Sequence, residues 1–113
     1  MNKVMFIGRI TKDIELKHLK ETNKYLASFQ LAVSRDFVNE KGERQADFIP
    51  VVAWEKNAEN LAKYTKKGSL ISVIGRLQIR DYETKEGTKK YISEVIAQEI
   101  QFLDNKKQKE EAV

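Results

Sequence analysis

Two apolar segments in the middle of the chain alternate with a period of two residues, and this alternation limits what the chain can fold into. Residues 47–54 read DFIPVVAW, and residues 69–82 read SLISVIGRLQIRDY. Side chains of equal parity share one face of an extended strand, so each segment predicts a strand with two unlike faces. In the second segment, the odd positions from 71 to 79 are apolar or glycine, and the even positions from 76 to 82 are basic, polar or aromatic. This pattern favours a sheet with one buried face and one exposed, cationic face.

Aromatic and basic residues are interleaved on these predicted strands. Phe48 and Trp54 fall on the same face of the first segment, while the second places Arg76 and Arg80 on one face and ends that face with Tyr82. Such a surface suits a single-stranded nucleic acid, because its phosphates attract cations and its unstacked bases stack on flat rings. The pattern therefore indicates a face that could bind nucleic acid.

Three further segments, 3–10, 25–35 and 90–103, also predict strands. Residues 56–67 place small and apolar side chains three and four positions apart, with Gly68 following two lysines. This spacing predicts a helix of about three turns that ends at the glycine. A helix with so narrow an apolar stripe is expected to lie across one end of a β core.

The order of these elements predicts an all-β fold, a five-stranded OB-fold Greek-key barrel with one short helix between the third and fourth strands. Residues 1–103 are expected to form this domain, and residues 104–113 a short, charged, disordered tail. Residues 11–24 are expected to be a connection without a strand, residues 36–45 a hairpin loop, and residues 83–88 the tip of a long hairpin.

Two predicted strands contain irregular positions. Pro50 has no backbone donor for a sheet, so the strand that contains it must be locally edge-like or irregular. The parity of residues 90–103 is mixed, because Glu94 shares a face with Ile92 and Ile96. A bulge is expected there, although its position does not follow from the sequence.

The aromatic residues have different expected environments. Phe6, Phe29 and Tyr64 are expected in the core, whereas Trp54, followed directly by two charged residues, is expected to be at least half exposed. Phe37 lies in a polar segment with no apolar residue at strand spacing nearby. It is either a plug over the end of the core or a platform on which a base stacks.

The composition limits the possible functions. The chain of 113 residues has a net charge of +4, which permits a polyanionic partner without requiring one. It contains no cysteine, no apolar run long enough to span a membrane, and no motif for a nucleotide, a metal or catalysis. The single histidine, His18, is expected to be an ordinary surface residue. A cytoplasmic binding protein without enzymatic activity, metal or cofactor is therefore expected.

Several segments closely resemble bacterial single-stranded DNA-binding proteins. They are VMFIGRI, LAVSR, KKYISEV and the central run from ADFIPVVAW to GRLQIRDY, in which W-x-K-x-A-E-N-x-A-x-Y-x-x-K-G-S is specific. The resemblance covers about residues 2–103. It implies an OB-fold protomer, a homotetramer, and binding of single-stranded DNA without sequence preference in replication, recombination, repair or DNA uptake, in the nucleoid-associated cytoplasm.

The resemblance also implies individual binding residues. The positions on which bases stack correspond to Phe37, Phe48, Trp54 and Tyr82. The basic positions that contact phosphates correspond to Lys3, Lys17, Arg44, Lys56, Lys67, Arg80 and Lys90. Arg76 is added because it shares parity with Arg80, although it could equally lie in a subunit interface.

Two further expectations concern partners. The alternative to DNA binding is an OB-fold adaptor that holds a protein through its aromatic face, and it predicts weak salt dependence and no preference for single strands. Long members of the family end in an acidic tip that recruits replication enzymes, whereas this sequence ends in KKQKEEAV. Recruitment of such enzymes through the C-terminus is therefore not expected.

Overall fold

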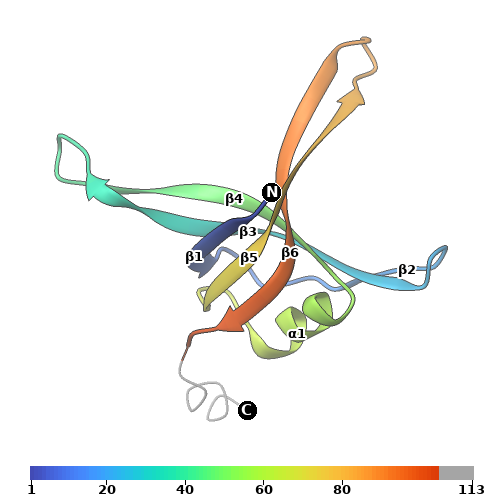
Figure 1. Cartoon of the computed structure of the whole chain (residues 1–113), viewed down its shortest axis with the longest axis horizontal. Helices are drawn as coiled ribbons and strands as arrows, with labels where there is room; N and C mark the ends of the chain where they lie inside the picture. Colours follow the sequence, from blue (N-terminus) through green and yellow to red (C-terminus); the bar gives the residue numbers. More distant parts are fainter. Residues whose placement is uncertain (105–113) are drawn as a thin grey trace.

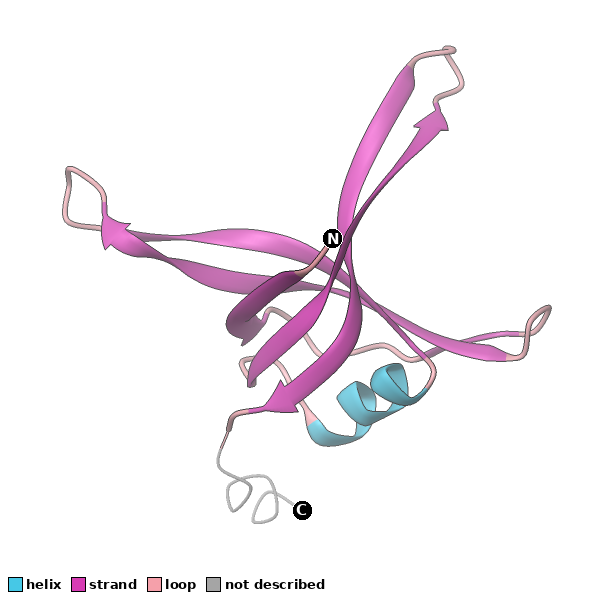
Figure 2. Ribbon diagram, in the orientation of Figure 1, coloured by secondary structure: helices cyan, strands magenta, loops and turns pink. Residues whose placement is uncertain are grey.

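The computed structural model describes residues 1–104, which form a closed β-barrel with one helix (Figures 1 and 2). Its elements in chain order are β1 (Val4–Ile10), β2 (Lys17–Leu19), β3 (Lys24–Val38), β4 (Arg44–Trp54), α1 (Lys56–Tyr64), β5 (Leu70–Glu83) and β6 (Lys89–Phe102). The helix packs against β3, β4 and β6. The predicted OB-fold barrel of five strands with one helix is confirmed. Most of the predicted tail, residues 105–113, lies outside the described residues.

Strand β1 closes the barrel because it pairs on both sides. It is antiparallel to β5 from Val4 to Arg9 and antiparallel to β3 at Arg9 and Ile10. The remaining pairs are β3–β4 and β5–β6, both antiparallel, and β4–β6, which is parallel. The interior is filled by apolar side chains from the five long strands and α1, among them Ile10, Leu31, Val51, Leu61, Ile71, Val73 and Val95.

Pro50 lies where only one edge of β4 is paired. It faces Gln30 of β3, whereas the parallel pairing of β4 with β6 involves Val51 and Val52. The missing backbone donor of the proline therefore falls outside the β4–β6 pairing. The prediction that this strand is locally edge-like is confirmed.

The bulge expected in the last strand lies at Gln98. Ile74 pairs with Glu99, but the next residue of β5, Gly75, pairs with Ala97, so Gln98 is the extra residue. The bulge changes which parity of β6 faces the core, from odd at Val95 and Ala97 to even at Ile100. Glu94 precedes the bulge and still shares its parity with Ile92 and Ile96, so the bulge does not explain its place among them. At the same place a Cβ on Gly75 would lie 2.2 Å from the carbonyl oxygen of Ile96, so only glycine fits.

Three hairpins project from the barrel as arms, formed by β2–β3, β3–β4 and β5–β6 (Figure 1). In two of these arms the sequence analysis predicted shorter strands than the structure has. The segment 11–24 contains the short strand β2, and half of the predicted loop 36–45 is strand, because β3 continues to Val38 and β4 begins at Arg44. Polar residues can pair as strands on an exposed arm, where no buried face imposes an apolar pattern.

Several expectations about burial were wrong. Tyr64 at the end of α1 is 47% exposed and packs beside Phe102, not in the core. Trp54 is 38% exposed, less than the expected half. Leu77 and Ile79 are also exposed, because β5 continues past the rim of the barrel into an arm. By contrast, Phe29 is buried and Phe6 packs against the core as expected.

Substitution of Gly75 by alanine is expected to lower the free energy of unfolding by about 2–4 kcal/mol, because the new methyl group would overlap backbone that cannot move freely. Chemical denaturation at fixed protein concentration measures this. Ser72→Ala on the same strand is the control and should change stability by less than about 0.5 kcal/mol. A Gly75→Ala protein as stable as the wild type would contradict the close approach.

Candidate nucleic-acid interface

The outer face of β4 carries two exposed aromatic rings. Val51 and Ala53 point into the core, so the residues of opposite parity point outward, and Phe48 and Trp54 are both exposed. Their shared face, expected from parity alone, is present in the structure. Pro50, which lies between them on the same face, is exposed as well.

Cross-strand pairing places a lysine in line with Trp54. Lys17 of β2 faces Leu26 of β3, and Leu26 faces Trp54 of β4. Directly opposed residues in antiparallel strands project from the same side of a sheet about 5 Å apart. Lys17 and Trp54 therefore lie on one face, separated by Leu26.

A second line of paired residues connects β4 to the β5–β6 arm. Val52 faces Ile96 of β6, and Ile96 faces Arg76 of β5. The outer face of β4 is thus continuous with the even-numbered face of β5. Farther along that face, Tyr82 pairs with Lys90, which places an exposed ring beside an exposed ammonium group.

Phe37 lies in β3 near the tip of the β3–β4 arm, not in a loop. Its side chain is 72% exposed. An exposure this high excludes the plug over the end of the core. Tyr91, a further exposed ring on the β5–β6 arm, was not selected from the sequence. It pairs with Asp81 and so faces the opposite side of the arm from Tyr82.

The predicted cationic residues differ in their availability. Six are exposed and belong to no ion pair within residues 1–104: Lys3, Lys17, Lys56, Lys67, Arg76 and Lys90. The other two are engaged within the protein. Arg80 donates from Nε to Oε1 of the buried Glu94 at 3.0 Å, and Arg44 donates from Nη1 to the carbonyl oxygen of Arg35 at 2.7 Å.

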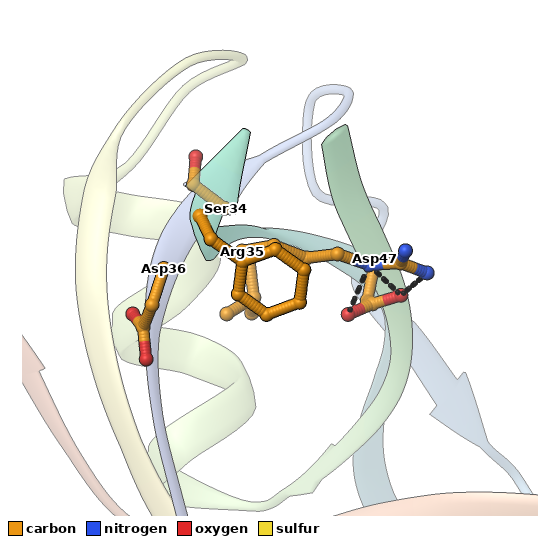
Figure 3. Close-up of a pocket in the computed structure, with 6 residues that line it drawn as sticks. Ser34, Arg35, Asp36 and Asp47 are labelled. Atoms are coloured by element: carbon orange, nitrogen blue, oxygen red, sulfur yellow. Dashed lines mark hydrogen bonds and ion pairs between the residues drawn. The ribbon is translucent and has the colours of Figure 1, made fainter. Parts of the chain in front are cut away.

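Arg35 and Asp47 form an ion pair that the sequence analysis missed (Figure 3). Arg35 Nη2 lies 2.8 Å from Asp47 Oδ1, and Nε donates to both carboxylate oxygens at 3.2 and 3.3 Å. The hydrogen bond from Arg35 lowers the pKa of Asp47, and the same contact raises the pKa of Arg35. The pair borders an open concavity of about 470 Å³ that Phe37 also lines. The partners lie twelve positions apart in the sequence, so no local motif signals their contact.

The part of the chain that the structure describes provides few groups for other chemistry. No three His, Cys, Asp or Glu side chains of residues 1–104 are grouped so that they could hold a metal ion. None of the described helices is long and apolar enough to cross a membrane. His18 Nε2 donates to Asn23 Oδ1 at 2.7 Å, and the ring packs beside Tyr25.

The fold and this surface define the class: an OB-fold barrel with exposed rings and cations along one outer face. Residues 1–103 match the single-strand binding protein family, to which the chain therefore belongs. It is 49% identical over 108 residues to single-stranded DNA-binding protein 1 of Clostridium acetobutylicum, covering 96% of this chain and 98% of that protein. It is 53% identical over 104 residues to single-stranded DNA-binding protein 3 of the same organism, covering 92% and 72%.

A solved structure is also similar. The Plasmodium falciparum SSB complex with ssDNA matches with a TM-score of 0.79 and 28% sequence identity, covering 92% of this chain and 96% of that one. The similarity of fold extends over almost all of the described residues.

Replacement of Arg35 by glutamine is expected to raise the pKa of Asp47 toward the ordinary value of about 3.9, because the hydrogen bond that lowers it is lost. In the wild type, the pair contributes to stability above that value, and the contribution is lost as the pH falls through the lowered pKa of Asp47. Carbon-13 NMR titration of the side-chain carboxyl groups measures the shift. Lys63→Gln, on α1, is the control. An unchanged midpoint in the Arg35 variant would contradict the pairing.

Proposed function

We propose that the protein binds single-stranded DNA without base-sequence preference and protects it in replication, recombination, repair or DNA uptake. The observation that carries this proposal is the pair of exposed rings, Phe48 and Trp54, on a strand face that also carries Lys17 and runs on to Arg76. The family relationship supports the same assignment.

The proposed mechanism has two parts. Exposed lysine and arginine side chains neutralise phosphates and release counterions, so affinity falls as the salt concentration rises. Rings stack on bases, and each contact contributes about 1–3 kcal/mol whatever the base. Duplex DNA offers the phosphates but not the base faces, so single strands are preferred.

The proposed binding residues are those that the sequence analysis selected, and they are expected to contribute unequally to the affinity for DNA. Base stacking is assigned to Phe37, Phe48, Trp54 and Tyr82. Phosphate contacts are assigned to Lys3, Lys17, Lys56, Lys67, Arg76 and Lys90, with smaller contributions from Arg44 and Arg80, whose donors are partly used within the protein. The pairing of Arg76 with Ile96 favours the DNA surface over a subunit interface for this residue.

The first test uses the only tryptophan, Trp54. Its emission should be quenched strongly by oligo-dT, saturate at a fixed number of nucleotides per chain, and recover as salt is added, whereas a duplex of equal charge should quench it little. Phe48→Ala should weaken oligo-dT binding by roughly 5- to 150-fold, the equivalent of one stacked base.

Phe102→Ala is the matched control for Phe48→Ala, because Phe102 is exposed but contacts Tyr64 at the end of α1. It should leave the affinity unchanged. Equal, weakly salt-dependent binding to single-stranded and duplex DNA would instead favour the adaptor that holds a protein partner.

Absence of enzymatic activity and a nucleoid-associated, cytoplasmic location remain predictions.

The proposed assembly is a homotetramer. The edge of β1 from Val4 to Gly8 pairs with no second strand within residues 1–104, and Met5 and Ile7 on this strand are exposed. Beside them lies an apolar groove of about 520 Å³ that Ile74 and Leu103 also line. An open strand edge next to an apolar surface can pair with its own copy about a two-fold axis, and two such dimers complete a tetramer.

Ile7→Glu is expected to dissociate the tetramer, because it places a charge in the apolar contact. Light scattering after size-exclusion chromatography measures the mass. Ile79→Glu is a matched control, since Ile79 is 61% exposed and Ile7 60%, but Ile79 lies on an arm. A tetramer that persists in the Ile7 variant, or that Ile79→Glu dissociates equally, would contradict the role of β1.

A further inference from the structure

The β3–β4 arm contains a bulge that no ladder of backbone hydrogen bonds fixes. Ser34 pairs with Ala46 and Val38 with Arg44, so three residues of β3 lie opposite one residue of β4, Gln45. Phe37 is one of these three residues. Bulges redirect side chains and leave backbone groups unpaired, so other contacts must define the geometry of this one.

Arg35 supplies most of those contacts. Its guanidinium binds Asp47 through Nε and Nη2, and Nη1 donates to Gln45 Oε1 at 2.9 Å. The backbone carbonyl of Arg35 accepts the bond from Arg44 Nη1. The first residue of the bulge is therefore tied to three residues of β4. A planar guanidinium that binds a carboxylate with two donors fixes direction as well as distance.

The same contacts lie close in the sequence to two of the exposed rings, Phe37 and Phe48. Phe37 follows Arg35 by two residues on β3, and Phe48 follows Asp47 directly on β4. Phe37 is largely exposed, so packing holds its ring only weakly and the backbone must direct it. Backbone pairing of β3 with β4 stops at Ser34 and resumes at Val38, and the Arg35–Asp47 pair joins the two strands by side chains at the first residue of this gap.

We infer that Arg35 is a positioning residue, which acts through Asp47 and Gln45 to hold the bulge in the geometry that presents Phe37 to a base of single-stranded DNA. The inference rests on the proposed function, because it takes Phe37 as a stacking residue. In this role the guanidinium of Arg35 binds Asp47 and does not need to contact a phosphate.

The variant Asp47→Asn separates this role from the alternative that Arg35 contacts phosphate. A direct contact predicts tighter binding, because the substitution removes an anion and frees the arginine. A positioning role predicts weaker binding to oligo-dT, by about three- to tenfold, a part of the effect of one stacked base. Asp81→Asn is the matched control: Asp81 is an exposed carboxylate paired with Lys89 on another arm, and its loss should not weaken binding.

The measurement is the affinity of fluorescein-labelled oligo-dT by anisotropy, at several salt concentrations, for Asp47→Asn, Phe37→Ala and the double variant. The inference requires that Asp47→Asn weakens binding, leaves the salt dependence unchanged, and causes no further loss once Phe37 is alanine. Loss of fold alone would not give this coupling. If Asp47→Asn does not fold, Arg35→Lys replaces it. Lysine keeps the positive charge but lacks the planar guanidinium that binds the carboxylate through two nitrogens.

The remaining outcomes overturn the inference in distinguishable ways. Tighter or unchanged binding by Asp47→Asn, or losses that add to that of Phe37→Ala, would refute the positioning role and leave the proposed function standing. If Phe37→Ala has no effect, Phe37 is not a stacking residue and the inference fails with it. If the wild type does not prefer oligo-dT to duplex, the proposed function itself fails.

Discussion

The barrel depends on two places where one backbone approaches another too closely for any side chain. A Cβ on Gly8 of β1 would lie 2.4 Å from the carbonyl oxygen of Ala32, and a Cβ on Gly75 of β5 would lie 2.2 Å from that of Ile96. The first approach lets β1 meet β3, and the second accompanies the bulge of β6. The first lies where β1 and β3 close the sheet, and the second lies between the neighbouring strands β5 and β6. Closure in turn gives every strand an outer face, and the remaining properties of the molecule follow from how that face is divided.

The outer face is divided between two kinds of contact. Near β1 it is apolar, with Met5 and Ile7 exposed next to an open strand edge. Across β4 it carries aromatic rings, and along the even-numbered side of β5 it carries cations. Water-exposed apolar surface favours association between chains, whereas interleaved rings and cations favour an unpaired polyanion. One closed sheet can therefore support assembly and binding on separate parts of its surface.

The sequence predicted the parts of this structure whose burial imposes a periodic pattern. The barrel strands, the helix and the shared face of Phe48 and Trp54 follow from parity and spacing, and the edge-like or irregular position of Pro50 follows from its missing backbone donor. The arms were predicted less well, because exposed strands carry no apolar alternation: β2 was missed and β3 was ended before Phe37. The Arg35–Asp47 pair could not be found, since it depends on the pairing of β3 with β4 across a bulge.

The rings on the barrel and the rings on the arms are held in different ways. Phe48 and Trp54 are fixed by the paired strand that carries them, whereas Phe37 and Tyr82 lie on projecting hairpins. On both hairpins an arginine two residues before the ring binds a carboxylate of the partner strand: Arg35 binds Asp47, and Arg80 binds Glu94. Glu94 is only 8% exposed, so its charge needs that partner. Each of these two arms therefore has an ion pair between its strands, two residues before the aromatic residue. At this position packing against the core no longer determines the direction of the aromatic side chain.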